Sequence, residues 1–216
     1  ARSHAGVAAV GDKIYVVGGA APGRVAFNEV YDTRTDTWTA KSPLPLARDG
    51  VQAVAALGKL YVFGGSDGAA LSKNEEYDPA TDIWTLKAPL STARYDFAAA
   101  LLGGKIYAVS GANPGLVASV EAYDPGADSW VERSPIPTPR SAAMTAAAGG
   151  RLYSIGGNNG PKLDTNESFD PGTSSSFTAL TPNTSYSFKA KARNISGVES
   201  PETAVFSTFT LAAVPS

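Results

Sequence analysis

The 216-residue sequence contains no cysteine and a single histidine, His4. Without cysteine the chain can form no disulfide and offers no thiol for catalysis, and a zinc site built from cysteine and histidine is excluded as well. A hydrolase triad finds no support, because the only histidine lies at the very start of the sequence. There is no P-loop either. These absences predict a non-enzymatic protein that binds no metal and no cofactor.

Positive charge and long apolar runs are also scarce. Lysine and arginine number 18 against 20 acidic residues, which gives a formal net charge of −2. A nucleic-acid-binding surface would be basic, so nucleic acid is not an expected partner. No apolar run approaches the roughly 18 residues needed to cross a bilayer, so we expect no membrane insertion.

What the sequence does have is a repeat. The stretch Lys59–Gly65, read K-L-Y-V-F-G-G, returns in similar form as 13–19, 105–111 and 151–157. The tyrosines of the four copies are 46 residues apart, and several other positions keep this spacing without an insertion. They are Arg2, Arg48, Arg94 and Arg140; Glu29, Glu75, Glu121 and Glu167; and Trp38, Trp84 and Trp130. A period of this length indicates stacked structural units.

Each copy reads as four short strands. In the second copy these are about Val51–Leu57, Lys59–Phe63, Asn74–Tyr77 and Ile83–Leu86. The first two are apolar and suit strands covered on both faces, whereas the last two alternate as outer strands do. Such a sheet cannot be stable alone, and radial stacking would bury its faces. The sequence therefore predicts an all-β chain built as a β-propeller.

The order of arginine, strand, Gly-Gly and Glu-x-Tyr-Asp-Pro-x-Thr-x-x-Trp resembles the kelch repeat. The resemblance covers residues 1–177 and implies a propeller of four blades whose first strands line a central channel. It also implies that the tryptophans are buried between blades and that the glycine pairs lie where neighbouring blades crowd together. These pairs are Gly18 and Gly19, Gly64 and Gly65, and Gly156 and Gly157; the third copy has Ser110-Gly111 instead.

After the fourth copy the pattern changes. Its tryptophan position holds Ser176, and the L-x-P-x-T-x-Y sequence of a tyrosine corner follows at Leu180–Tyr186. Residues 178–216 thus resemble the C-terminal half of a fibronectin type III domain and form a predicted second unit. Half a sandwich leaves a strand edge unpaired, so self-association through this segment is one expected consequence.

The sequence alone does not decide whether the blades close into a ring. Four blades could form a closed ring, an open arc could be completed by another chain, or the exposed blade of an arc could be covered by residues 178–216. The small residues of the channel-lining strands, such as Ala53 and Ala55, favour close approach around the axis. We therefore expect a compact or nearly closed four-bladed propeller, with the final segment forming a β-hairpin.

The repeated arginines invite comparison with kelch enzymes that act on sialic acids. A residue that is present in all four copies, however, is expected to have a structural role in each repeat. We expect the arginines to bond backbone carbonyls or acidic groups of a neighbouring blade, with the repeated glutamates as partners. A kelch-type copper radical oxidase is excluded because it would need a cysteine and histidine ligands.

Positions that vary between copies are the candidates for ligand binding. Two residues after each arginine stand His4, Gly50, Asp96 and Ala142, and the kelch resemblance places His4 and Asp96 at the channel mouth. The loops after the glycine pairs are a second variable region, because binding residues tend to lie on loops of a rigid scaffold. Their candidates are Arg24, Asp67, Asn113, Asn158, Asn159 and Lys162. The alternative is that these residues are solvated turns.

The sequence thus favours a non-catalytic structural or binding module of a larger extracellular or cell-surface protein, with a protein or glycan ligand at the propeller face. The alternative is a glycan-modifying enzyme, similar to a sialic acid mutarotase, that uses the channel mouth.

Overall fold

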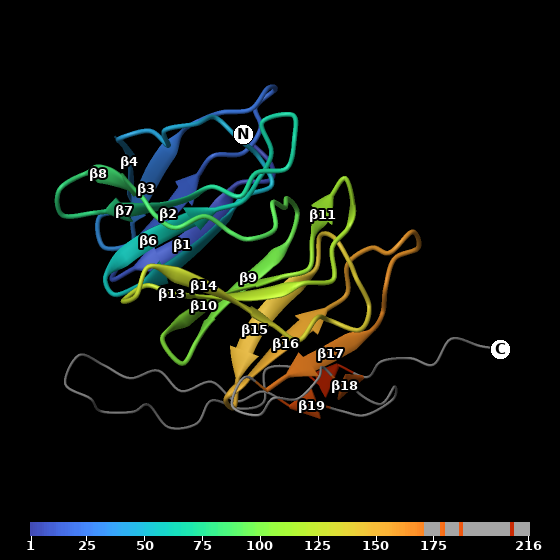
Figure 1. Ribbon diagram of the computed structural model, residues 1–216. Coiled ribbons are helices and arrows are strands. Elements are labelled where there is room, and N and C mark those ends of the chain that lie inside the picture. The colour runs from blue at the N-terminus through green and yellow to red at the C-terminus, as the bar shows by residue number, and fades with distance from the viewer. Residues whose placement is uncertain (171–177, 180–185, 188–207, 210–216) are drawn as a thin grey trace. The chain divides into compact units, whose positions relative to one another are not determined.

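The computed structural model describes residues 1–170, 178–179, 186–187 and 208–209. All regular structure in these residues is β-strand (Figure 1). The chain divides into two compact units, Ala1–Thr178 and Ala179–Ser216. Of the second unit the structure describes β19 (Tyr186–Ser187) and β20 (Thr208–Phe209), which pair antiparallel. The predicted fibronectin-like segment otherwise lies outside the described residues.

The first unit consists of four antiparallel sheets of four strands, one for each repeat. Blade 1 contains β1 (Gly6–Val10), β2 (Lys13–Val17), β3 (Asn28–Asp32) and β4 (Thr37–Lys41). Blade 2 contains β5 (Gln52–Ala56), β6 (Lys59–Phe63), β7 (Asn74–Asp78) and β8 (Ile83–Leu86). Blade 3 contains β9 (Ala98–Leu102), β10 (Lys105–Val109), β13 (Val120–Asp124) and β14 (Ser129–Arg133), with the short pair β11 (Ala112–Asn113) and β12 (Gly115–Leu116) between. Blade 4 contains β15 (Met144–Ala148), β16 (Arg151–Ile155), β17 (Asn166–Phe169) and β18 (Thr178–Ala179). The predicted all-β propeller of four blades is confirmed.

The first two strands of each blade form a tight hairpin. In blade 2 two residues, Leu57 and Gly58, connect β5 to β6, and both have positive φ angles, 53° and 73°. This pair of angles matches the twist of a two-residue hairpin turn. Blades 3 and 4 place Gly-Gly at the same position. The turn therefore fixes the strand register in blades 2, 3 and 4.

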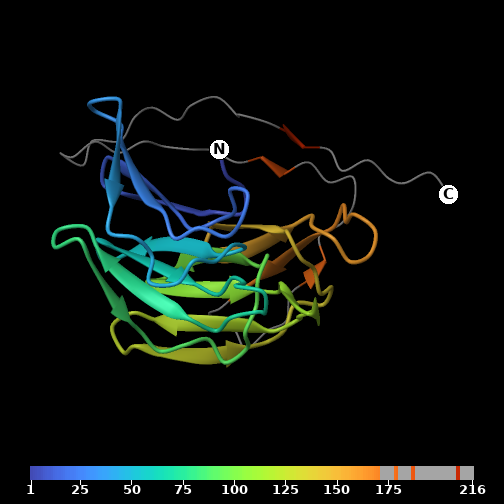
Figure 2. The same ribbon diagram turned by 90° about the horizontal axis from the view of Figure 1, so that it is seen from above.

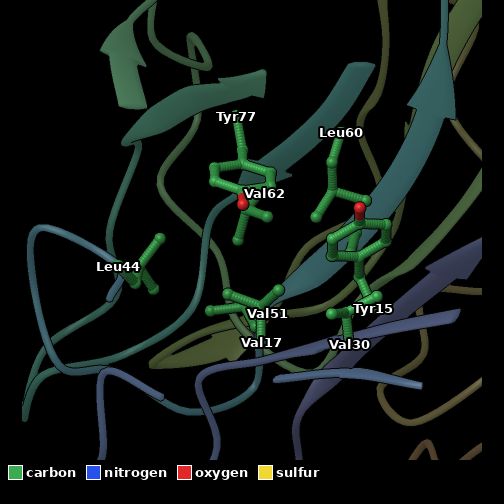
Figure 3. Close-up of a cluster of buried hydrophobic side chains, with 9 residues drawn as sticks. Tyr15, Val17, Val30, Leu44, Val51, Leu60, Val62 and Tyr77 are labelled. Carbon is green, nitrogen blue, oxygen red and sulfur yellow. The ribbon is translucent and has the colours of Figure 1, made fainter. Parts of the chain in front are cut away.

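The apolar core lies between blades. Blades 1 and 2 enclose a cluster that includes Tyr15, Val30, Leu60 and Tyr77 (Figure 3). The rings of Tyr15 and Tyr77, one from each blade, lie 5.8 Å apart. Similar clusters lie between blades 2 and 3 and between blades 3 and 4, and Figure 2 shows the sheets layered on one another. Each sheet thus depends on its neighbour for burial, as in other repeat architectures.

The repeated arginines act inside their own blade, which corrects the expectation that they bond a neighbouring one. Arg94 is fully buried; it donates to the carbonyls of Ser110 and Ser119 at 2.9 and 2.8 Å and forms an ion pair with Glu121 at 2.6 Å. All of these partners belong to blade 3. The same pairing joins Arg48 to Glu75, Arg140 to Glu167 and, at a more exposed position, Arg2 to Glu29. The repeated glutamates are therefore the arginines' partners, as expected.

The arginine backbone makes the link between blades. Glycine N–H groups donate to the arginine carbonyl of the next blade, as Gly65 does to Arg94 at 2.8 Å. A Cβ on Gly64 would stand 2.8 Å from the Arg94 carbonyl oxygen, so the crowding expected at the glycine pairs is present. In blade 3 Ser110 takes the first position, and its hydroxyl donates to the Arg140 carbonyl at 2.7 Å.

The two end blades differ from the expected near-closed ring. Backbone hydrogen bonds join blades 1 and 2, 2 and 3, and 3 and 4, but within residues 1–170 none joins blade 4 to blade 1. Trp84 and Trp130 are partly buried between blades, whereas Trp38 of blade 1 is 59% exposed. The burial expected for Trp38 is therefore wrong, because no described blade covers that face.

We expect substitution of Arg94 by leucine to destabilise the propeller by about 3–5 kcal/mol, because Glu121 would be left charged and buried without its partner. Urea denaturation of the variant measures the effect. Lys105→Ala, which breaks the partly exposed ion pair with Asp124, serves as the control and should cost less than about 1 kcal/mol. Equal costs for the two variants would contradict the structural role of the arginine.

A pair of glycine substitutions separates backbone conformation from crowding. Gly58 and Gly64 both have positive φ, but nothing lies within 4 Å of a Cβ at Gly58, whereas one at Gly64 would meet Phe97 at 2.5 Å. Gly58→Ala should cost about 1–2 kcal/mol for the left-handed backbone alone. Gly64→Ala should cost a further 1–3 kcal/mol for overpacking. Thermal unfolding of both variants gives the comparison; similar losses would show that the blades can separate without penalty.

Candidate binding site at the channel mouth

Four residues, one from each repeat, form a row across the blades that is here called the rim: His4, Gly50, Asp96 and Ala142. All four have positive φ, between 49° and 61°. The last three donate their backbone N–H groups to the rim carbonyl of the preceding blade: Gly50 to His4 at 3.0 Å, Asp96 to Gly50 at 3.2 Å, and Ala142 to Asp96 at 2.7 Å. The left-handed conformation costs little at glycine and is strained at other residues. Its presence at all four positions indicates that the surrounding structure imposes it.

A cavity of about 270 Å³ opens beside the rim and draws its lining from blades 1, 2 and 3 and the loops between them. Its lining residues are His4, Arg24, Asp49, Gly50, Ser66, Gly68, Tyr95 and Asp96. The lining is predominantly polar, with two carboxylates, one guanidinium and one imidazole. This composition fits a ligand that offers hydrogen-bond donors.

One side of the cavity is held by an ion pair between loops of different blades. Arg24, on the loop after β2, contacts the Asp49 carboxylate at 3.0 Å. Asp49 and Ser66 exchange two backbone hydrogen bonds, of 3.1 and 2.8 Å, which hold the backbone of the two segments together. Arg24 thus neutralises one of the two carboxylates of the cavity.

Asp96 presents the second carboxylate. Within the described part of the chain its carboxyl oxygens have no hydrogen-bond partner, and the side chain is partly buried. Burial raises the pKa of Asp96, the nearby Asp49 raises it further, and His4 opposes the shift. A Cβ at Gly50 would stand 2.9 Å from an Asp96 carboxyl oxygen, so the glycine leaves room for this group. The cavity therefore contains an acceptor that the protein itself does not satisfy.

The structure brings together three of the predicted site residues, His4, Arg24 and Asp96. Asp67 is exposed between two lining residues and does not line the cavity. The remaining candidates lie exposed on the loops of blades 3 and 4, away from the lining: Asn113, Asn158, Asn159 and Lys162.

Sequence reasoning missed Asp49, Ser66 and Tyr95. Asp49 and Tyr95 follow the repeated arginine directly, at a position where the first and fourth copies have serine, so the copies vary there too. The same test of variability would have found both. Ser66 begins one of the variable loops after the glycine pairs, but its role depends on the pairing of its loop with Asp49.

Ser66 also belongs to a G-x-S-x-G sequence, Gly64–Gly68, but the surroundings are not those of a hydrolase nucleophile. That motif requires a turn between a strand and a helix, and no helix follows here. The Ser66 hydroxyl accepts hydrogen bonds from Gly68 N–H at 3.1 Å and from Arg24 at 3.5 Å. No described histidine contacts it, so a catalytic triad is not assembled.

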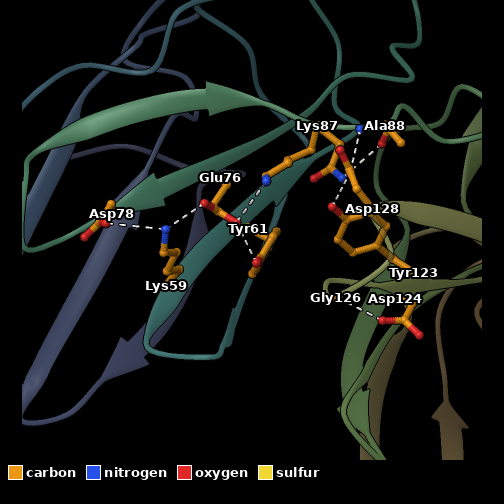
Figure 4. A network of polar contacts seen from close by, with 11 residues as sticks. Lys59, Tyr61, Glu76, Asp78, Lys87, Ala88, Tyr123, Asp124, Gly126 and Asp128 are labelled. Atoms are coloured by element: carbon orange, nitrogen blue, oxygen red, sulfur yellow. Dashed lines mark hydrogen bonds and ion pairs between the residues drawn. The ribbon is translucent and has the colours of Figure 1, made fainter.

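A second polar network lies on the outer side of the boundary between blades 2 and 3 (Figure 4). Glu76 accepts a hydrogen bond from the Tyr61 hydroxyl at 2.6 Å and contacts Lys59 and Lys87. Burial and this hydrogen bond raise the pKa of Tyr61, which therefore remains a neutral donor. Because its members bond one another, the network has a structural role.

Neither a metal site nor a membrane span is visible in the described ranges. No group of three or more histidine, cysteine, aspartate and glutamate side chains is placed there to hold a metal ion. No helix in that part of the chain is long and apolar enough to cross a membrane.

Four-stranded sheets stacked in sequence order, with a repeated arginine–glutamate pair in each and a glycine pair in three of the four repeats, define a β-propeller of the kelch class. A family model described as the KLHDC2/KLHL20/DRC7 Kelch-repeats domain matches residues 3–199. The chain belongs to this kelch-repeat family. The matched range extends beyond residue 177, where the sequence analysis placed the end of the repeats.

Among solved structures, the chain is similar to one titled "Structure of YjhT", with a TM-score of 0.72 and 20% sequence identity. The match covers 84% of this chain but 66% of the YjhT chain, so this protein spans slightly less than two thirds of that length. At this identity the likeness shows the fold alone. A comparison with curated proteins gave no match.

The unpaired Asp96 carboxylate should make the folded protein less stable at neutral pH. Because its pKa is raised on folding, the ionised form is penalised above the folded pKa, and the penalty disappears as the pH falls below about 3.9, the unfolded value. Asp96→Asn should therefore raise the unfolding midpoint at pH 7 and leave it unchanged at pH 3. Asp67→Asn is the control and should have no effect at either pH. A destabilised Asp96→Asn protein at pH 7 would show that the carboxylate has a stabilising partner.

Proposed function

We propose that the protein is a non-catalytic binding module that takes a protein or glycan ligand at the channel mouth. The observation that carries the proposal is the Asp96 carboxylate, which lines a polar cavity without a partner of its own. An unsatisfied, partly buried acceptor costs stability, and a ligand that donates hydrogen bonds to it would recover that cost. Membership of the kelch family supports a binding role.

The charges of the cavity narrow the kind of ligand. Arg24 compensates Asp49, so Asp96 carries the charge that no cation within bonding distance compensates. Hydroxyl groups of a sugar, or amide and amino groups of a protein, supply the donors that this arrangement accepts. His4 and Tyr95 add further polar atoms at the edge.

The competing function is a glycan-modifying enzyme similar to a sialic acid mutarotase. Its support is the presence of an arginine and two carboxylates in one cavity. The repeated arginines argue against it, because Arg48, Arg94 and Arg140 are fully buried and bonded within their blades. They therefore cannot contact a ligand without the propeller opening.

An extracellular or cell-surface position in a larger protein is part of the proposal. It is based on the sequence, in which kelch repeats are followed by a fibronectin-like segment. Self-association through residues 178–216 is likewise a proposal and involves residues that lie largely outside those described.

Two assays on one preparation separate the functions. A glycan array with sialylated and neutral glycans, together with a peptide array, should give specific binding, and NMR of free sialic acid should show no acceleration of mutarotation. Asp96→Asn should reduce binding at least about tenfold, the scale of one lost charge-assisted hydrogen bond. Asp67→Asn, which is close by but outside the cavity, should bind normally. Catalytic turnover would refute the binding module, and an unaffected Asp96→Asn variant would exclude this cavity as the site.

A further inference from the structure

Blades 2 and 3 are each fastened to the preceding blade by the same three side chains, here called the latch. In blade 2 the latch consists of Tyr77, Asp82 and Trp84. The Trp84 indole N–H donates to the Ser42 carbonyl of blade 1 at 2.8 Å, and the Ser42 N–H donates to Asp82 at 3.0 Å. Tyr77 donates its hydroxyl to Asp82 at 2.6 Å and packs on the Trp84 ring. The latch thus binds both polar groups of one residue's backbone.

The latch of blade 3 repeats this geometry. Trp130 donates to the Ala88 carbonyl of blade 2 at 2.9 Å. The Ala88 N–H donates to Asp128 at 2.9 Å (Figure 4). Tyr123 donates to Asp128 at 2.6 Å. Ser42 and Ala88 are each followed by proline and a buried leucine. The partner of a latch is therefore the turn after a fourth strand, with the sequence small residue, proline, leucine.

Blade 1 contains the same latch, already assembled, but the described residues include no blade that it could bind as blades 2 and 3 bind theirs. Tyr31 donates its hydroxyl to Asp36 at 2.5 Å, and the Tyr31 and Trp38 ring centroids lie 5.2 Å apart at 42°, close to the 4.9 Å and 40° of blade 2. In the described residues nothing accepts from the Trp38 indole, and no backbone N–H from another blade reaches Asp36. The three side chains of blade 1 are therefore arranged as in blade 2, but in the described residues no turn of another blade is bound to them.

Two backbone groups of blade 1 are unpaired in the same way. The carbonyls of Arg48, Arg94 and Arg140 each accept a hydrogen bond from the preceding blade, and the rim N–H groups of blades 2 to 4 each donate to it. Among the described residues the corresponding Arg2 carbonyl and His4 N–H have no such partner. Val7, the counterpart of buried Ala53, is 56% exposed on the same face.

We propose that this face of blade 1 is the docking surface for a two-blade kelch segment, bound head to tail as blade 1 binds blade 2. Every open group on the face matches a group that is satisfied at the existing blade boundaries, which makes a kelch blade the fitting partner. The match covers 66% of the YjhT chain, and the uncovered third has about the length of two of these blades. A second copy of this chain would bring four blades, which is twice the two blades that this length corresponds to.

The 46-residue period allows a direct test. A chain in which residues 1–92 are placed before Ala1 of the complete sequence keeps the repeat in phase and puts Ala88 of the added segment opposite Trp38. In this extended chain Trp38→Ala, introduced in the original segment, should lower the unfolding midpoint by about 3 °C or more. In the 216-residue chain the same substitution should shift the midpoint by less than about 1 °C.

Asp36→Asn is the second, milder variant and should show the same dependence on context. Leu86→Ala, on an exposed side chain outside the latch, should have equal effects in both chains. Hydrogen exchange of the His4 amide should slow in the extended chain. Equal effects of Trp38→Ala in the two chains, or unchanged His4 exchange, would overturn the proposal. Trp38-dependent self-association of the 216-residue chain in sedimentation would also overturn it, because the occupant would then be a second copy.

Discussion

The ion pair between a buried arginine and a buried glutamate is the interaction on which each blade depends. Removing the two charges from water costs free energy. This cost is offset because carbonyls of the same blade accept hydrogen bonds from the remaining guanidinium protons, as Ser110 and Ser119 do for Arg94. With the side chain fixed, the arginine carbonyl stands where the glycine of the preceding blade can reach it. The hydrophobic clusters then fill the space between sheets whose spacing has already been set.

The repeat made most of the fold predictable. The predicted limits of the second repeat's strands agree with β5 to β8 to within one residue at each end, because its turns and apolar runs are local signals. The partners of the arginines were assigned to the wrong blade, since spacing along the chain does not say on which side of a sheet a long side chain folds back. The exposure of Trp38 was missed for a related reason: a repeat unit looks the same whether or not it has a neighbour.

The cavity was predictable only in part. His4, Arg24 and Asp96 could be named because they vary where the scaffold is constant. The Arg24–Asp49 contact joins loops of different blades and depends on how the sheets stack, which no local pattern encodes. The same reasoning named Asn158 and Lys162, which belong to blade 4 and lie on its loop outside the lining. Variability between repeats identifies surface positions that the fold does not constrain. Which of these residues lie together in one cavity depends on how the blades are placed in space.

The latches and glycine contacts described above join only adjacent blades, and this has a consequence for how the molecule comes apart. Blades 2 and 3 have a neighbour on each side, whereas blade 1 has one described neighbour. In such a one-dimensional array free energy is shared only between nearest units, so opening begins at an end and moves inward. The residues of the cavity come from blades 1, 2 and 3, so loss of blade 1 would remove His4 and Arg24 first. For a ligand bound in this cavity, as proposed above, retention of the ligand and integrity of the blade 1 sheet would form a single equilibrium.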